Sequence, residues 1–230
     1  MTQVIAFDVN ETLLDLRALD RPFEELLGSA ALRGPWFAQM LQLAFVGGII
    51  GDYVDFGVAQ AAALRMVAQR EGVVVSDDQV RAIVDRMRSL PPHPEVPDAL
   101  ARLRRHPLRV VALTNSTGEV AEAQLTNANL RERFDAVLSA DSVRALKPAA
   151  APYRAVAQAF AVPIGEVRLV AAHAWDVAGA LAAGAKAAFV ARPGMVLSPL
   201  APRPDIVAAD ISAVVDEIIA HDAPAPRVQR

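Results

Sequence analysis

Short apolar runs recur along the chain at wide spacing, with polar segments between them. Four runs predict buried strands, at residues 4–7, 108–113, 167–172 and 187–190, and weaker candidates lie at 136–138 and 205–208. Between most of them, apolar residues recur with helical spacing, at 97–105, 118–127, 152–161 and 177–183. Strands that alternate with helices indicate the α/β class, with a parallel sheet covered by helices on both faces.

Residues 16–92 break this alternation, because their apolar spacing is helical throughout. It predicts helices near 16–27, 36–46, 56–69 and 77–89. The Pro-rich segment 90–94 cannot continue a helix and closes the block. We therefore predict two domains: a core formed by residues 1–15 and 93–230, and an all-helical cap formed by residues 16–92. A cap inserted there overhangs the carboxyl end of the first strand.

Composition narrows the class of partner. The net charge is −3 at pH 7 and the chain contains no cysteine, which argues against nucleic-acid or anionic-membrane partners and excludes thiolate chemistry. The apolar segment 41–50 is too short to span a bilayer, and the N-terminus lacks the basic start of a secretory signal. We expect a cytoplasmic protein with a small-molecule substrate. Segment 41–50 has two interpretations, core packing or a homodimer contact, and the Pro-rich segment 223–230 is expected to fray.

The first strand ends at a carboxylate. Asp8 follows the apolar run 4–7, and Thr12 comes four residues later. Ligands bind at the carboxyl ends of strands in α/β sheets, so Asp8 is a candidate nucleophile of the aspartyl type. The alternative is an ordinary turn built on an acidic residue.

Three later segments also place polar groups after predicted strands. Thr114 and Asn115 are either donors to an oxyanion or leaving group, or a helix cap. Lys147 precedes a proline; it either keeps a nearby carboxylate ionised or is a solvated surface lysine. His173 and Asp176 either orient a water molecule or serve structural roles, as a strand-end histidine and a helix cap.

The order of these segments resembles the haloacid dehalogenase superfamily, and residues 16–92 resemble its cap domain. The resemblance covers residues 4–220, implies a Rossmann-like core, and is greatest to the type II, (S)-2-haloacid dehalogenase group. The shared details are Asp8 with Thr12, the Thr114-Asn115 pair, Lys147-Pro148 with Tyr153, Ala174-Trp175-Asp176 with Gly179-Ala180, and Trp36 with Phe56.

Two replacements bear on the reaction. Most members of the superfamily transfer phosphoryl groups, and the resemblance implies two further carboxylates for that chemistry, at positions that Asn10 and Ala172 occupy here. Mg²⁺ needs hard oxygen ligands, and phosphoryl transfer relies on the metal, whereas a leaving halide needs no proton. We therefore predict a hydrolytic dehalogenase of small 2-haloalkanoic acids that uses no metal or cofactor. A Mg²⁺-dependent phosphatase and a weakly active or inactive binding protein are the alternatives.

The resemblance also implies a mechanism, in which Asp8 displaces halide to form an ester that water then hydrolyses. It gives catalytic roles to Asp8, Thr12, Lys147 and Asp176. The candidate substrate-binding residues are Asn10, Arg33, Phe37, Phe56, Thr114, Asn115, Tyr153, His173 and Trp175.

Several positions depart from the family pattern. Phe37 stands where the family has a halide-binding arginine, and Arg33 is the candidate to replace it from the preceding loop. Ala171 and His173 replace a serine and an asparagine, and Asn10 replaces a tyrosine. Phe37 and Ala171 are the departures that motivate the binding-protein alternative.

Overall fold

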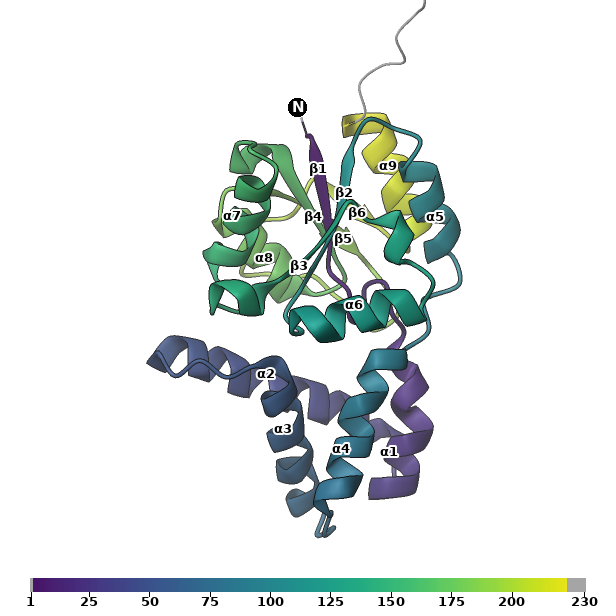
Figure 1. Ribbon diagram of the computed structural model, residues 1–230, viewed down its shortest axis with the longest axis vertical. Helices are drawn as coiled ribbons and strands as arrows, with labels where there is room; N and C mark the ends of the chain where they lie inside the picture. Colours follow the sequence, from purple (N-terminus) through teal and green to yellow (C-terminus); the bar gives the residue numbers. More distant parts are fainter. Residues whose placement is uncertain (1, 223–230) are drawn as a thin grey trace, which may run out of the picture.

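The computed structural model describes residues 2–222, and in that range six parallel strands form one sheet (Figure 1). Their order is β3-β2-β1-β4-β5-β6, which confirms the predicted α/β fold with a Rossmann-like sheet. Segment 223–230, expected to fray, lies outside the described residues. The strand bounds are β1 Val4–Phe7, β2 Arg109–Thr114, β3 Ala136–Ser139, β4 Val167–Ala171, β5 Lys186–Val190 and β6 Ile206–Ala208.

The two faces of the sheet are covered by different helices because strand side chains alternate. In β1, Ile5 and Phe7 join one apolar layer, while Val4 and Ala6 join the other. The first layer includes residues of α5 (Val96–Leu103), α6 (Gly118–Asn127) and α9 (Ile211–Asp222). The second includes residues of α7 (Ala150–Ala159) and α8 (Ala174–Ala182). Both layers were expected, but α9 was not predicted.

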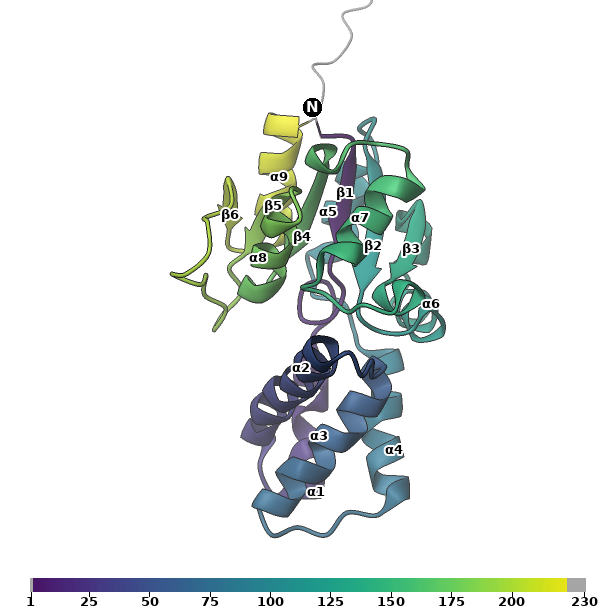
Figure 2. The same ribbon diagram turned by 90° about the vertical axis from the view of Figure 1, so that its left-hand side faces the viewer.

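Helices alone fill the segment that follows β1 and its turn. They are α1 (Asp20–Leu27), α2 (Arg33–Ile50), α3 (Phe56–Arg70) and α4 (Asp77–Asp85). Two predicted helices are shorter, because residues Leu16–Leu19 and Arg86–Ser89 form 3₁₀ turns. Figures 1 and 2 show α2 lying between the sheet and the other helices of this segment, across the carboxyl ends of the strands.

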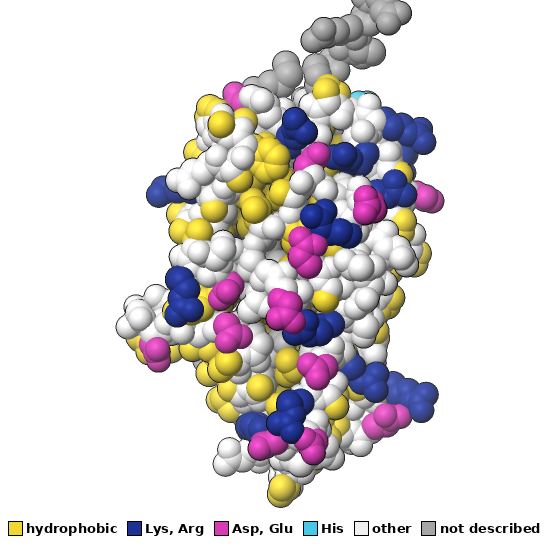
Figure 3. Space-filling view, viewed as in Figure 1, with side chains coloured by type: hydrophobic (Ala, Val, Ile, Leu, Met, Phe, Trp, Pro, Cys, Tyr) yellow, Lys and Arg dark blue, Asp and Glu magenta, His cyan; other side chains and the backbone are white. Residues whose placement is uncertain are grey.

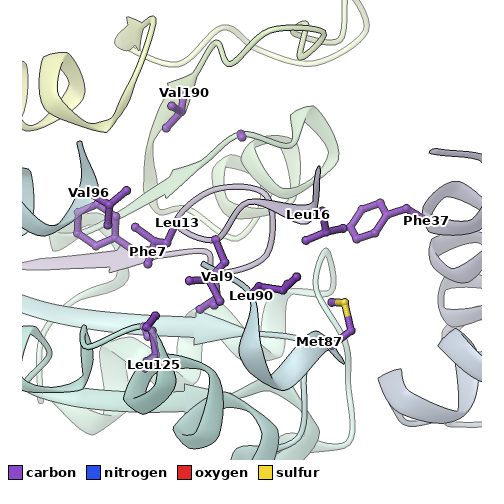
Figure 4. Close-up of a cluster of buried hydrophobic side chains, with 14 of the residues drawn as sticks. Phe7, Val9, Leu13, Leu16, Phe37, Met87, Leu90, Val96, Leu125 and Val190 are labelled. Atoms are coloured by element: carbon purple, nitrogen blue, oxygen red, sulfur yellow. The ribbon is translucent and has the colours of Figure 1, made fainter. Parts of the chain in front are cut away.

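Apolar side chains connect this helical segment to the sheet. Phe7, Leu13, Leu16 and Phe37 belong to one buried cluster. Figure 4 shows Leu16 and Phe37 pointing toward one another at the edge of α2. The cluster therefore fixes α2 above the end of β1, where Asp8 lies.

The surface carries both signs of charge, interspersed over the face shown in Figure 3. Within residues 2–222, no helix combines the length and hydrophobicity that a membrane span requires. Segment 41–50 is compatible with both core packing and a homodimer contact, because Ala44 is buried while Ile49 is 84% exposed. The homodimer contact stays a prediction.

Candidate active site

Strands β1 and β4 lie side by side at the centre of the sheet, where the strand order changes direction. Asp8 follows β1, and its backbone N–H donates to the carbonyl of Val170 in β4 at 3.0 Å. His173 and Asp176 follow β4, at the start of α8. The carboxyl ends of the central strands at such a switch point form the usual ligand site of an open α/β sheet.

Asp8 is buried and accepts hydrogen bonds from three side chains. The Lys147 Nζ atom lies 2.8 Å from Oδ1, and the Thr12 hydroxyl donates to Oδ2 at 2.6 Å. His173 Nδ1 lies 3.1 Å from the same Oδ2. Burial alone raises the pKa of Asp8, but the charge of Lys147 and the hydrogen bond from His173 outweigh it and hold the pKa well below its usual value. The carboxylate is thus kept ionised in a dry site.

Lys147 is fully buried and has an acceptor for each of its three N–H groups. These are Asp8, Asp176 Oδ2 at 2.6 Å and the carbonyl of Leu113 at 3.0 Å. Burial lowers the pKa of Lys147, but Asp176 and Asp8 raise it above its usual value. Lys147 is therefore a fixed cation within the site, and the solvated-lysine alternative is wrong.

Asn115 holds the backbone of Lys147 in place. Its side-chain oxygen accepts the Lys147 N–H at 2.8 Å, and its amide donates to the Lys147 carbonyl at 3.1 Å. Asn115 therefore positions Lys147 through its main chain. One of the two amide N–H groups of Asn115 is not used in these bonds, so its predicted role in binding substrate stays a prediction.

Tyr153 supports Asp176 from behind. Its hydroxyl donates to Asp176 Oδ1 at 2.6 Å, so Tyr153 positions Asp176, and its predicted contact with substrate stays a prediction. Burial raises the pKa of Asp176, the charge of Lys147 lowers it and the nearby Asp8 raises it again, with a net upward shift. Gly179 is required here, since a Cβ atom on it would lie 2.7 Å from the Tyr153 hydroxyl.

Glu11 completes the surroundings of His173 and was missed in the sequence. Its Oε2 lies 2.9 Å from His173 Nε2, and its Oε1 lies 3.5 Å from Arg33 Nη1. Arg33 also donates to Asp20 at 2.6 Å. The guanidinium of Arg33 thus pairs with Glu11 and Asp20 and approaches His173 only through Glu11, so its predicted role in halide binding stays a prediction. The sequence did contain one indication of the role of Glu11, because it is a charged residue within the turn from Asp8 to Thr12.

Two aromatic rings stack on His173. Phe37 stacks on the imidazole with ring centroids 5.5 Å apart, and Trp175 stacks on it at 5.2 Å. Burial lowers the pKa of His173, but hydrogen bonds to Asp8 and Glu11 outweigh it and raise the pKa to about 9. His173 is therefore an imidazolium near neutral pH when Asp8 is ionised.

The indole of Trp175 has an unused donor. Its Nε1 is buried and has no hydrogen-bond acceptor among residues 2–222. A buried donor without a partner is costly, so this N–H is a candidate to bind an anion next to Asp8.

Three other predicted site residues contact groups other than Asp8. Asn10 accepts from the Gln124 amide at 2.9 Å and lies 3.4 Å from Ser116 Oγ. Thr114 accepts the Ser116 N–H at 3.2 Å. Phe56 is buried beside a separate hollow of about 200 Å³ that Ser116 also lines. The substrate roles predicted for Asn10 and Phe56 are not supported by this placement.

Two cavities flank the site and differ in character. An apolar cavity of about 520 Å³ lies between α2 and the loop 144–149, and Phe45 and Pro148 line it. Phe45 packs edge-on against Trp175 at 5.4 Å, so Phe45 connects the lining of this cavity to Trp175, which stacks on His173 beside Asp8. A polar cleft of about 290 Å³ is lined by Glu11, Asp15, Arg17, Arg33, His93, Glu95 and Arg192. It lies on the side of His173 that faces Glu11.

The residues at the two positions where phosphoryl transfer needs carboxylates, Asn10 for the acid and Ala172 for the Mg²⁺ ligand, do not supply them. The Asn10 side chain is bound to Gln124, and Ala172 offers only a methyl group. Within residues 2–222, no group of three or more histidine or acidic side chains is arranged to hold a metal. Because Mg²⁺ requires several oxygen ligands in near-octahedral geometry, this donor set gives no support to the phosphatase alternative.

Comparisons with known proteins agree with the predicted resemblance. The family model for haloacid dehalogenase-like hydrolases matches residues 2–184. An (S)-2-haloacid dehalogenase of Pseudomonas sp. (strain YL) is 28% identical over 214 residues, which cover 92% of each chain. Haloacetate dehalogenase H-2 of Moraxella sp. (strain B) is 27% identical, covering 93% of this chain and 96% of that protein. The solved structure of L-2-haloacid dehalogenase from Xanthobacter autotrophicus superposes with a TM-score of 0.90 at 25% identity, over 97% of this chain and all of that one.

Proposed function

Because the chain belongs to the haloacid dehalogenase-like hydrolase family, we propose that it hydrolyses the carbon–halogen bond of small 2-haloalkanoic acids. The observation that carries the proposal is the pairing of ionised Asp8 with buried Lys147 at the switch point of the sheet. The curated relatives named above are dehalogenases of such acids. No metal ion is assigned to the reaction, because the donor set at the Mg²⁺ position does not fit one.

The first step forms an ester at Asp8. Oδ2 accepts hydrogen bonds from Thr12 and His173, whereas Oδ1 accepts one from Lys147. Oδ1 therefore retains the freer lone pair and is the proposed attacking atom. It forms a bond to the carbon that carries the halogen, and the halide leaves with the bonding electron pair.

The leaving halide needs a hydrogen-bond donor, because Phe37 offers none where the family has an arginine. The buried N–H of Trp175 has no other acceptor among residues 2–222 and lies on the ring that stacks against His173. We assign it the role of halide donor. Two cations lie close to this indole: the imidazolium of His173, with ring centroids 5.2 Å apart, and Lys147, whose Nζ lies 6.0 Å from the Trp175 ring centroid.

The second step returns Asp8 to its starting state. Water forms a bond to Cγ of Asp8, and the ester C–O bond breaks to release a 2-hydroxy acid. Both side-chain oxygens of Asp176 are already bound, to Lys147 and Tyr153. Asp176 is thus better placed to hold Lys147 than to activate water.

The apolar cavity suits the aliphatic part of such an acid. Its lining comes from α2 and the loop that precedes Pro148, and burial of alkyl groups there excludes water from the neighbouring ions. Thr12 and Thr114 are proposed to orient the carboxylates of enzyme and substrate.

The test is halide release from (S)-2-chloropropionate, measured by ion chromatography with EDTA and with added Mg²⁺. We expect equal release in both, and an Asp8 adduct by mass spectrometry after rapid quenching. Cleavage of an aryl phosphate that stops on chelation would favour the phosphatase. No release from a panel of haloacids, with no adduct on Asp8, would favour a binding protein.

Two further expectations from the sequence remain proposals. A homodimer contact through the exposed end of α2, with Ile49 and Ile50 84% and 68% exposed, predicts a dimer in sedimentation experiments. A cytoplasmic location predicts activity in the cytosolic fraction of cells.

A further inference from the structure

His173 lies between two carboxylates in different surroundings. Its Nδ1 is 3.1 Å from Asp8 in the dry site, and its Nε2 is 2.9 Å from Glu11. Asp8 and His173 are 5% and 6% exposed, whereas Glu11 lines the polar cleft. The three side chains thus form a hydrogen-bonded path from the reacting carboxylate to the cleft.

We propose that His173 is the base that takes a proton from the hydrolytic water and that Glu11 passes protons from it to the polar cleft. This role rests on the proposed function, because His173 acts on the ester that forms at Asp8. It makes His173 a catalytic residue and Glu11 a positioning and relay residue.

The geometry is that of an oriented base. When Glu11 accepts the Nε2–H, the other ring nitrogen faces Asp8 and can accept a proton there. The stacked rings of Phe37 and Trp175 hold the imidazole plane, with interplanar angles of 15° and 24°. A water molecule that attacks Cγ of Asp8 therefore bonds to the carbon next to Oδ2, the atom that Nδ1 faces.

Formation of the ester at Asp8 converts His173 into its neutral form, which can accept a proton. The charged groups around His173 are Asp8 and Glu11 in direct contact, Lys147 and Asp176 beyond Asp8, and Arg33 beyond Glu11. Ionised Asp8 helps to raise the pKa of His173 to about 9, so the ring is protonated in the free enzyme. Alkylation removes the charge of Asp8, the pKa of His173 falls, and its proton passes to Glu11. Neutral His173 is then present only when there is an ester to hydrolyse.

The protons balance in this scheme. Water gives one proton to His173 as its oxygen bonds to Cγ, and His173 returns a proton to the product oxygen as the ester C–O bond breaks. The second proton of water remains on the Asp8 carboxyl and passes to His173 as the carboxylate forms again. The proton that left through Glu11 after alkylation is the one released per turnover, together with one halide.

The polar cleft beside Glu11 is suited to receive the proton that His173 releases after alkylation. The polar cleft holds about 290 Å³ and is lined by charged side chains, among them Arg33 and Arg192, so it can hold ordered water. Glu11 also has a φ of 61°, a left-handed backbone conformation that favours glycine. A glutamate held in that conformation is consistent with a functional side chain.

The decisive variant is His173→Gln, because glutamine keeps polar contacts but cannot take up a proton. We expect a halide burst of one equivalent, an accumulated Asp8 ester in the mass spectrum, and ester hydrolysis slowed by at least about 100-fold. If this variant hydrolyses the ester at the wild-type rate, or loses the burst while still folded, the proposal is wrong. A wild-type enzyme that releases no halide would instead overturn the proposed function together with this role.

Glu11→Gln tests the relay and decides the question if His173→Gln does not fold. The halide burst should persist, ester hydrolysis should slow, and its pH profile should shift to lower pH, because loss of the anionic neighbour lowers the pKa of His173. Glu95→Gln is the matched control, since Glu95 lines the same cleft but pairs with Arg192. Equal effects of the two substitutions would contradict the proposal.

The pH profile of the wild-type second step separates a base from other roles. Single-turnover ester hydrolysis should rise with pH through the pKa of His173 in the ester and then level off. A purely structural histidine would give no such profile. A rate that falls with rising pH would assign His173 as an N–H donor to the oxyanion and would overturn the proposal.

Discussion

Buried charge gathers at both ends of the parallel sheet, and the two clusters differ in a way that identifies the site. At the amino end, Arg168 of β4 is buried and donates to Asp205 at 2.6 and 2.8 Å, and also to Asp222. At the carboxyl end, one Lys147 is shared by two carboxylates, Asp8 and Asp176. In both clusters one cation faces two carboxylates, but Arg168 binds Asp205 through two parallel N–H groups, whereas Lys147 binds both of its carboxylates from the single Nζ atom.

The pKa shifts show the same contrast. At the amino end, the hydrogen bonds from Arg168 lower the pKa of Asp205, and they outweigh burial to lower that of Asp222 as well. At the carboxyl end, the pKa of Asp8 is lowered while that of Asp176 is raised. Carboxylates driven apart in pKa are typical of reactive sites. Burial of charge alone therefore does not mark the catalytic end of this molecule.

The largest expected effect separates the clusters by activity. Asp8→Asn removes the proposed nucleophile and should lower halide release by at least about 10⁴-fold, measured by ion chromatography. The fold should persist, because Lys147 keeps Asp176 as a partner. Asp205→Asn, in the opposite cluster, is the control and should keep wild-type turnover. Comparable losses of halide release in both variants would contradict the conclusion that only the cluster at the carboxyl end is catalytic.

A substitution in the cluster at the amino end of the sheet should lower stability and leave turnover unchanged. Arg168→Met leaves Asp222 buried without its main partner, which should lower the free energy of unfolding by about 3–5 kcal/mol in urea titrations. Turnover per folded molecule should not change. Arg21→Met, which removes an exposed pair with Glu25, is the control and should have little effect. A stable Arg168→Met enzyme would contradict the structural role.

The raised pKa of His173 makes stability depend on pH. The folded chain retains a proton that the unfolded chain loses, so the stabilisation is fully present below about pH 6.5 and is lost as pH rises through about 9. Its size is on the order of 3 kcal/mol. We expect the stability difference between wild type and His173→Gln to shrink over this window in urea titrations. A difference independent of pH would show that His173 is not charged in the folded enzyme.

The smallest effect tests how tightly the lysine loop is packed. In Gly179→Ala the new methyl carbon would lie 2.5 Å from Pro148 Cβ, so stability should fall by about 1–3 kcal/mol and turnover should fall as Lys147 shifts. Gly118→Ala is the control, because nothing lies within 4 Å of its Cβ position. If thermal unfolding shows Gly179→Ala to be as stable as Gly118→Ala, the packing role is wrong.

Most of the fold was predictable because its strands are short, apolar and buried on both faces. The prediction for β1 matches Val4–Phe7, and that for α6 matches Gly118–Asn127. The missed helix α9 is apolar over much of its circumference and follows the weak strand β6. Helix ends were less predictable, since the 3₁₀ turns depend on how the segment after β1 packs.

The site was predictable only where motif order fixes it. Asp8, Thr12, Lys147 and Asp176 meet because the carboxyl ends of parallel strands converge at one edge. Contacts that depend on side-chain direction were not predictable. Arg33 turns to Glu11 and Asp20, and the left-handed backbone at Glu11, which sets where its side chain points, has no clear signal in the sequence.

Apolar side chains pack continuously from Phe7 in the sheet to Phe37 on α2, and this packing predicts how the molecule unfolds on heating. Removing α2 from the sheet would wet both partners at once, so the helical segment has little stability of its own to retain. Heating should therefore give a single calorimetric transition, with equal calorimetric and van't Hoff enthalpies.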